Sequence, residues 1–168
     1  AEVGAALIID ATQSSSMLDL NGPDWQVDAI ITSGYKWLGG HGGVALSYLS
    51  NALVDRTPVL AGWMGAPEPL NFDAKRVPFA DLASRFTMST MSYLSITGLA
   101  SALELGLERE PEATMDHTHR LKTYLKDALS TTGWDPYHQA LDPSPIVSLG
   151  HPNVDGSDVF ERLLNEGI

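Results

Sequence analysis

Lys36 lies between two mainly apolar stretches of the sequence, and this setting suggests chemistry for its side-chain amine. The stretch 27–31 has the character of a strand, and a glycine-rich turn at 39–43 leads into a second strand-like stretch at 44–49. A lysine held at a strand end among small residues can be desolvated, which favours the neutral, nucleophilic amine. The chemistry that this predicts is Schiff-base formation with a carbonyl compound. Taken alone, the motif fits equally well a tight turn that carries a solvated lysine.

A carboxylate and an amide follow another apolar stretch, upstream of this lysine. Residues 7–9 form a continuous apolar run, which is typical of a buried parallel strand, and Asp10 and Gln13 come directly after it. In open α/β sheets, ligands bind in the crevice beyond the carboxyl ends of the strands. If this strand and the strand before Lys36 are neighbours, the polar side chains at their ends face one pocket.

The polar groups expected in this pocket match the needs of one cofactor, pyridoxal phosphate. Its aldehyde requires an amine, which Lys36 supplies, and its pyridine nitrogen requires a carboxylate, which Asp10 supplies. Its phosphate requires hydrogen-bond donors such as the hydroxyl of Ser33. The sequence therefore predicts a pyridoxal-phosphate site beyond the ends of these two strands.

The order of these residues resembles a known protein family. The segments 10–13 (Asp-Ala-Thr-Gln) and 33–40 (Ser-Gly-Tyr-Lys-Trp-Leu-Gly-Gly), with Asp28 between them, resemble the class V aminotransferase group of fold type I pyridoxal-phosphate enzymes. This group includes cysteine desulfurases, selenocysteine lyases, isopenicillin N epimerase-like proteins and kynureninases. The resemblance implies an α/β fold, an amino acid as the substrate and a homodimer as the assembly.

The resemblance also implies a role for each candidate site residue. Asp10 matches the carboxylate that pairs with the pyridine nitrogen, and Gln13 matches the amide that hydrogen-bonds the phenolic oxygen of the ring. Lys36 matches the catalytic lysine that forms the Schiff base, and Ser33 matches a phosphate ligand. Tyr35 stands where cysteine desulfurases commonly carry histidine, which is more similar to kynureninases, and its hydroxyl can donate a hydrogen bond to the phosphate.

A second segment, 85–90, resembles the Arg-Phe-Glu-x-Gly-Thr motif of the family, with Thr87 in place of the acid and Ser89 in place of the glycine. The resemblance implies that Thr90 contacts the cofactor phosphate of the partner subunit. From the residues alone, Thr90 fits equally well a cap of the following helix. The Gly-Trp pair at 62–63 is also similar to a family motif.

The composition narrows the classes of partner. A net charge of -11 argues against binding to nucleic acid or to anionic membranes, whereas a small anionic cofactor needs only a few local donors. No apolar run approaches the roughly 20 residues that cross a bilayer. The sequence has no cysteine, so it offers neither a disulfide nor a thiolate metal site. We expect no nucleic-acid or membrane partner, no metal, and a cytoplasmic location.

Several individual side chains are assigned to structural roles. His117 and His119 are two residues apart and would point to different faces of a helix, so we interpret them as surface residues rather than metal ligands. Trp25 and Trp37 are interpreted as packing residues, because large aromatic side chains carry much of the burial in a core. His41 is interpreted as a turn residue.

The pattern along the chain predicts an α/β fragment in two parts. We expect residues 1–92 to be the carboxyl-terminal part of the large cofactor-binding domain, and residues 93–168 to be a linking helix and the start of a small α/β domain. The chain begins just ahead of a predicted strand and stops where another is about to start, so we expect a portion of a longer protein. The further elements predicted are a helical turn at 23–25, an irregular stretch at 51–84, helices at 93–110, 111–130 and 157–165, and a strand at 145–149.

Three hypotheses for function follow from these observations. The leading one is a pyridoxal-phosphate enzyme that acts on an amino acid through Lys36, by transamination, carbon–sulfur or carbon–selenium cleavage, epimerisation or kynurenine-type cleavage. The second is a non-catalytic α/β binding module, in which Asp10 and Gln13 cap a helix and Lys36 is a turn residue. The third is a Schiff-base enzyme without this cofactor, such as an aldolase. The isolated fragment is expected to be weakly active or inactive.

Overall fold

The structure is a computed structural model, which describes residues 3–73, 75–76, 78–136 and 144–168. The chain divides into two compact units, Ala1–Arg109 and Glu110–Ile168. The boundary between the units follows the helix that begins at residue 93, whereas the sequence pattern predicts a domain boundary before this helix. The assignment of two domains, 1–92 and 93–168, stays a prediction.

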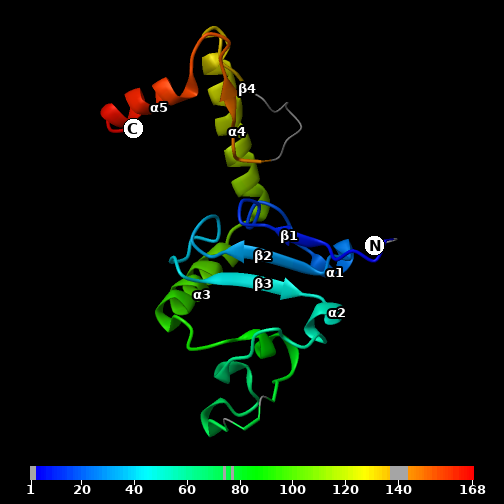
Figure 1. Cartoon of the computed structure of the whole chain (residues 1–168). Coiled ribbons are helices and arrows are strands. Elements are labelled where there is room, and N and C mark those ends of the chain that lie inside the picture. The colour runs from blue at the N-terminus through cyan, green and yellow to red at the C-terminus, as the bar shows by residue number, and fades with distance from the viewer. Residues whose placement is uncertain (1–2, 74, 77, 137–143) are drawn as a thin grey trace. The chain divides into compact units, whose positions relative to one another are not determined.

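A mixed sheet of three strands forms the centre of the first unit (Figure 1). Strand β2 (Ala29–Ser33) lies between β1 (Ile8–Asp10), to which it is parallel, and β3 (Ala45–Leu49), to which it is antiparallel. The predicted parallel pairing of the first two strands is confirmed. The backbone N–H of Leu7 donates to Asp28 Oδ2 at 2.8 Å, which fixes the start of β1 against the start of β2.

The small hydrophobic core covers one face of this sheet. It consists of Ala11, Val27 and Ile30, with Ile9, Leu20 and Tyr48 packed against it. On the other face, Ile8 is 59% exposed and Ile31 is 43% exposed. The expectation of a buried strand at 7–9 is therefore wrong for Ile8, because the described residues leave this face of the sheet open, and Leu7, which precedes β1, is 49% exposed.

Short helices connect and follow the strands. Helix α1 (Gly22–Trp25) confirms the predicted helical turn. Asn21 caps it, since its Oδ1 accepts a hydrogen bond from the Asp24 backbone N–H at 3.2 Å. Pro23 lies in the first turn, where no helical hydrogen bond needs its missing N–H. The stretch 51–84 is irregular, as predicted. Its elements are α2 (Asn51–Val54) and the short 3-10 helices Trp63–Gly65, Pro69–Asn71 and Leu82–Phe86.

Helix α3 (Tyr93–Leu107) closes the first unit and supports the loop that follows β2. Ser92 caps this helix, and its Oγ accepts a hydrogen bond from the Ser95 backbone N–H at 3.4 Å. Leu99, on the inner face of α3, is only 3% exposed. Figure 1 shows α3 in green beside the end of β2 and the start of β3. The predicted helix at 93–110 is thus confirmed, with its end at Leu107.

The second unit contains two helices and a short hairpin-like pair of strands. Helix α4 (Pro111–Leu129) and helix α5 (Gly156–Asn165) confirm the helices predicted at 111–130 and 157–165. Strand β4 (Asp135–Pro136) pairs antiparallel with β5 (Leu149–Gly150). His117 and His119 are both exposed on α4, in line with their interpretation as surface residues.

Two details of the second unit differ from the sequence prediction. The strand predicted at 145–149 is wrong, since only Leu149 lies in a strand. Pro145 has no N–H to donate to a ladder, and the backbone N–H of Ile146 donates to Ser144 Oγ at 3.1 Å instead of to a neighbouring strand. Helix α5 begins at Gly156, one residue before the predicted start, and Asp155 caps it: its Oδ1 accepts the Ser157 N–H at 2.8 Å.

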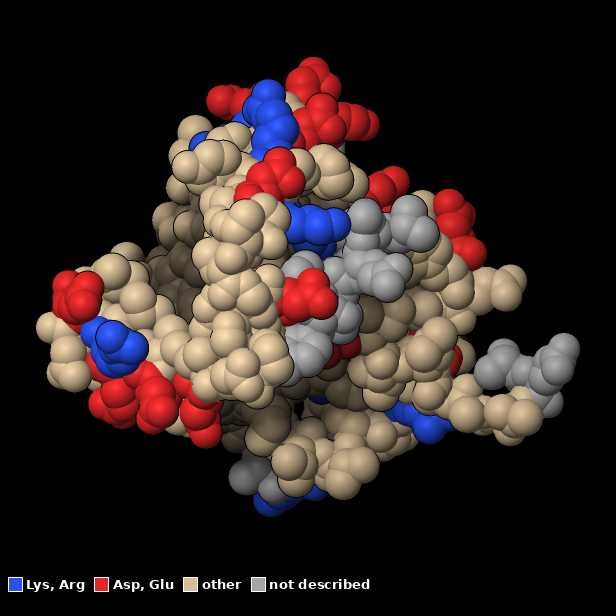
Figure 2. Space-filling view, turned by 90° about the horizontal axis from the view of Figure 1, so that it is seen from above, with Lys and Arg blue, Asp and Glu red and all other residues tan. Residues whose placement is uncertain are grey.

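Acidic side chains dominate the charge of the chain. Figure 2 shows them in several groups on the visible face, with basic side chains scattered between them. Within the described ranges, none of the helices has the length and apolar character that a membrane span requires. Groups of three or more histidine, cysteine or acidic side chains arranged to hold a metal ion are also absent from that part of the chain.

Candidate active site

The carboxyl ends of β1 and β2 meet at one edge of the sheet. Asp10 is the last residue of β1, and Ser33 is the last residue of β2. Thr12 Oγ1 accepts a hydrogen bond from the Ser33 backbone N–H at 3.1 Å, and the Ala11 N–H donates to the carbonyl oxygen of Ile31 at 2.7 Å. These two bonds hold the segment after β1 against the end of β2, so the polar residues that follow both strands lie together.

The carboxylate of Asp10 is exposed and is held in its ionised form. The Thr12 backbone N–H donates to Asp10 Oδ1 at 3.0 Å and closes a local turn. This hydrogen bond is the main reason why the pKa of Asp10 lies below its usual value of 3.8. The Thr12 hydroxyl and the positive charge of Lys36 also lower this pKa, whereas partial desolvation raises it. An anionic carboxylate within electrostatic reach of a lysine is thus present at this edge.

Gln13 is joined to the loop that carries the lysine. The indole Nε1–H of Trp37 donates to Gln13 Oε1 at 3.1 Å, across 24 positions of the sequence. Trp37 is 37% exposed, so its interpretation as a core packing residue needs correction: it makes a polar contact at the edge of the sheet. Trp25, at 43% exposed, is also outside the core.

The hydroxyl of Ser33 has an unusual environment. Ser33 Oγ is buried and makes no hydrogen bond with any of the described residues. Buried polar groups in native proteins are almost always hydrogen-bonded, so an orphaned hydroxyl at a strand end points to a missing partner. Together with the anionic Asp10 and the amide of Gln13, this donor set fits pyridoxal phosphate, which requires partners for a ring nitrogen, a ring oxygen and a phosphate.

Glycines fold the lysine loop, residues 34–40, tightly back onto the sheet and α3. The Gly34 N–H donates to the carbonyl oxygen of Val44 at 2.9 Å, and the Gly40 N–H donates to that of Gly34 at 2.8 Å. A Cβ added at Gly34 would lie 2.9 Å from Val44 Cγ1 and 3.1 Å from Leu99 Cδ2. A larger residue would require Val44 and Leu99 to shift, so glycine favours this close approach, which anchors the backbone on both sides of Lys36.

The remaining predicted site residues lie on the surface of the chain. Tyr35 is 57% exposed, and Lys36 is also exposed, so the desolvation expected for this lysine is not provided by the described residues. Thr90 is exposed in the segment that precedes α3, and no hydrogen bond among the described residues joins it to the other site residues. His41 is an exposed turn residue, as interpreted, with Nδ1 2.9 Å from the Gly42 carbonyl oxygen. The roles given to these residues stay predictions.

Sequence reasoning overlooked the residues that hold the site together. Thr12 is one of these residues, and the signal for it is the position of its hydroxyl between Asp10 and Gln13, from which it bonds the neighbouring strand. Beneath it, the buried Ser15 hydroxyl donates to the Ala11 carbonyl oxygen at 2.7 Å and is hydrogen-bonded to the Thr32 hydroxyl at 2.5 Å. No sequence pattern signals this pair, because its members are 17 positions apart.

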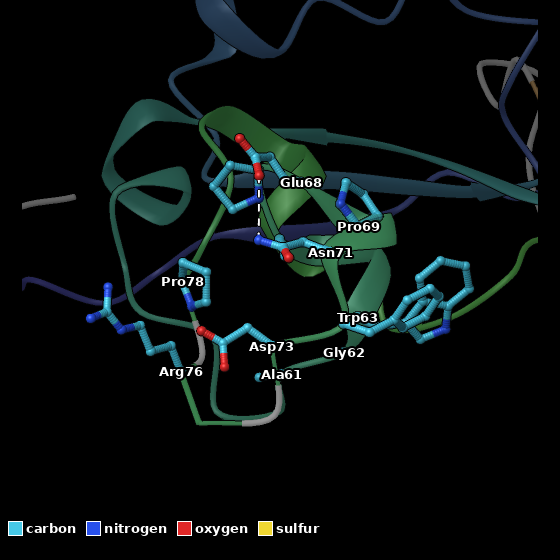
Figure 3. A pocket seen from close by; sticks show the side chains of 12 residues that line it. Ala61, Gly62, Trp63, Glu68, Pro69, Asn71, Asp73, Arg76 and Pro78 are labelled. Carbon is cyan, nitrogen blue, oxygen red and sulfur yellow. Dashed lines mark hydrogen bonds between the residues drawn. The ribbon is translucent and has the colours of Figure 1, made fainter.

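A separate cavity of about 540 Å³ lies in the irregular stretch of the first unit (Figure 3). Its walls include Trp63, whose ring centroid is 5.6 Å from that of Phe72, and a hydrogen bond from Asn71 Nδ2 to Glu68 Oε2 at 3.4 Å. The full lining is Ala61, Gly62, Trp63, Ala66, Pro67, Glu68, Pro69, Asn71, Phe72, Asp73, Arg76 and Pro78. None of the predicted cofactor-binding residues lines this cavity, so the candidate site is identified by the chemistry of its side chains and not by this cavity.

The chain is similar to proteins of one enzyme family. The sequence model of that family, described as aminotransferase class-V, matches residues 1–168. The kynureninase of Deinococcus radiodurans is 36% identical over 160 residues, which cover 90% of this chain and 38% of the kynureninase. The chain thus spans well under half of the length of this curated relative.

Solved structures show the same fold. The apo cysteine desulfurase of Thermococcus onnurineus has a TM-score of 0.85 at 20% identity, over 99% of this chain and 42% of the desulfurase. A variant of the lyase C-DES, with glycine covalently linked to its pyridoxal-phosphate cofactor, has a TM-score of 0.80 at 23% identity, over 96% of this chain and 42% of that lyase. The predicted fold class, an α/β portion of a fold type I protein, is confirmed. By its sequence over its whole length and by its fold, the chain belongs to the class-V aminotransferase family.

Proposed function

We propose that the full-length protein is a pyridoxal-phosphate-dependent enzyme that acts on an amino acid, with Lys36 as its catalytic residue. The observation that carries this proposal is the gathering of Asp10, Gln13, Ser33 and the lysine loop at one edge of the sheet, where a buried hydroxyl lacks a partner. Membership of the family supports it, because the family relatives include a kynureninase and the fold relatives include an enzyme with this cofactor.

Each residue would meet a different part of the cofactor. The Asp10 carboxylate would pair with the ring nitrogen, and its lowered pKa keeps it anionic at neutral pH. The amide nitrogen of Gln13 would donate to the ring oxygen. Ser33 Oγ, Tyr35 Oη and Thr90 Oγ1 would donate to the phosphate. Bound there, the cofactor supplies an electron sink for negative charge that develops at the α-carbon of the substrate.

The chemistry left to the chain itself is nucleophilic attachment and proton transfer at Lys36 Nζ. Glycines anchor the loop on both sides of this lysine, so the amine is presented from a fixed backbone. A fixed amine next to the substrate α-carbon can accept and return a proton, which is general acid–base catalysis.

We further propose a homodimer in the cytoplasm. In this assembly Thr90 of one subunit would contact the phosphate held by the partner subunit, which agrees with its exposure and with the lack of a hydrogen bond between Thr90 and the other described site residues. Light scattering of the purified full-length protein tests the assembly, and a monomeric mass at micromolar concentration would contradict it.

The test of the proposed function uses the full-length protein purified with pyridoxal phosphate. We expect a visible absorption band from the lysine-bound cofactor, which borohydride removes and which Lys36→Ala lacks. Lys75→Ala is the matched control, because it removes an exposed lysine from the irregular stretch of the same unit and should keep the band. Absence of the band from folded wild-type protein with added cofactor would overturn the proposal in favour of a non-catalytic module or a Schiff-base enzyme without the cofactor.

A further inference from the structure

The hydrogen bond between Trp37 and Gln13 fixes which way the Gln13 amide faces. An indole N–H is a donor only, so its partner must be an acceptor, and the amide therefore turns its Oε1 toward Trp37 at 3.1 Å. The amide nitrogen then faces away from Trp37. Among the described residues this nitrogen has no hydrogen-bond partner, although it carries two donor hydrogens.

Backbone hydrogen bonds fold the segments that carry both residues of this bond. Gln13 belongs to the turn after β1, where the Ser14 and Ser15 N–H groups both donate to the Ala11 carbonyl oxygen at 3.0 and 2.8 Å. Trp37 follows Lys36 in the glycine-anchored loop, and the Gly39 N–H donates to the Lys36 carbonyl oxygen at 3.0 Å. The bond therefore spans the edge at which Asp10 and Lys36 lie.

An exposed glutamine without such a bond has no preferred orientation. Its terminal amide rotates with little barrier, and either the oxygen or the nitrogen can face a ligand. A ring oxygen that carries negative charge is stabilised by the nitrogen and repelled by the oxygen. Fixing the amide in advance removes the unfavourable orientation before the ligand arrives, which is preorganisation.

We propose that Trp37 is a positioning residue, which acts through Gln13: by occupying Oε1, it presents the amide N–H groups as donors to the ring oxygen of the cofactor. This inference rests on the proposed function. A donor bonded to the ring oxygen stabilises its negative charge, so the oxygen holds the proton of the neighbouring lysine-linked nitrogen less tightly. Loss of the donor should therefore raise the pH at which the bound chromophore loses this proton.

The first arm of the test needs no cofactor. In the full-length apoprotein labelled with ¹⁵N, the indole resonance of Trp37 is identified by its disappearance in Trp37→Phe. Gln13→Met removes the acceptor and keeps a side chain of similar length. We expect the indole proton of Trp37 to move upfield and to exchange with solvent about fivefold faster, which is the protection that an ordinary net hydrogen bond confers. An unchanged resonance and exchange rate would overturn the inference whatever the cofactor does.

The second arm follows the absorbance of the loaded protein as a function of pH. We expect Trp37→Phe and Gln13→Met to shift the titration midpoint upward, and the double variant to shift it no further than Gln13→Met alone, because both act on one donor. Trp25→Phe is the matched control, since it changes an exposed tryptophan on α1 and should leave the midpoint unchanged. A purely structural role of Trp37 would lower the unfolding midpoint without this coupling to Gln13.

The two arms separate failure of the inference from failure of the proposed function. A shift in Gln13→Met but none in Trp37→Phe would overturn the positioning role and leave the cofactor site standing. A folded protein that shows the indole response but no visible chromophore in any variant would overturn the proposed function, and the role of Trp37 with it.

Discussion

Substitution of Gly40 by alanine should strain the lysine loop, and the loss in free energy of unfolding can be estimated from the structure. An ideal Cβ on Gly40 would lie 2.9 Å from Leu99 Cδ1, 3.0 Å from Leu99 Cα and 3.0 Å from the carbonyl oxygen of Gly34. Carbon atoms in good contact are about 3.5–4.0 Å apart. The end of the Leu99 side chain can rotate, but the other two atoms belong to backbone, so either the loop or α3 must move.

The expected magnitude follows from two opposing effects. Overpacking of a well-packed site costs about 1–3 kcal/mol. Replacement of a glycine by alanine also restricts the unfolded chain, which offsets about 0.4–1 kcal/mol of this cost. We expect Gly40→Ala to lower the free energy of unfolding by about 1–2 kcal/mol, and to weaken cofactor binding because the displaced loop carries Lys36.

Gly42→Ala provides the control within the same turn. No atom lies within 4 Å of an ideal Cβ at Gly42, so this variant should be neutral, or more stable by up to about 1 kcal/mol. Urea unfolding of the full-length protein, followed by circular dichroism, measures both variants. Equal urea midpoints for the two would refute the claim that contact with Leu99 and Gly34 makes glycine necessary at position 40.

Two further predictions concern the buried and ionised groups of the site. Ser15→Ala should lower the free energy of unfolding by about 1–3 kcal/mol, because the buried Thr32 hydroxyl loses its short bond to Ser15 and keeps only the 3.4 Å bond to the Ser33 carbonyl oxygen. Ser47→Ala, which removes an exposed hydroxyl of β3, should change it by less than about 0.5 kcal/mol in the same urea assay. Asp10→Asn should reduce stability more at pH 7 than at a pH below 3.8. Because the pKa of Asp10 in the folded protein lies below 3.8, the ionised carboxylate stabilises the fold above pH 3.8. This contribution is lost as the pH falls through the pKa that Asp10 has in the folded protein. An equal difference in thermal midpoint between wild type and Asp10→Asn at both pH values would argue against an ionised, hydrogen-bonded Asp10.

Local patterns predicted most of the elements and a set of candidate site residues, whose roles stay predictions. Apolar runs predicted the parallel strands, and the helical spacing of apolar residues predicted the starts of α3 and α4 to within a residue. The prediction failed at 145–149, where a short apolar run resembled a strand but Pro145 and the Ser144 side chain take the backbone out of a ladder. In that case a local hydrogen bond outweighed a weak strand preference.

By itself, the sequence determined the family, the fold class and the identity of the groups that suit pyridoxal phosphate, because each of these depends on residue types and on their order along the chain. Only the tertiary structure decided how those groups are held. The bonds from Ser33 to Thr12, from Trp37 to Gln13 and between Ser15 and Thr32 join positions 21, 24 and 17 residues apart. Such contacts form only after the strands have paired, since their geometry depends on register and on the turns that follow the strands, and neither can be read from residues next to one another.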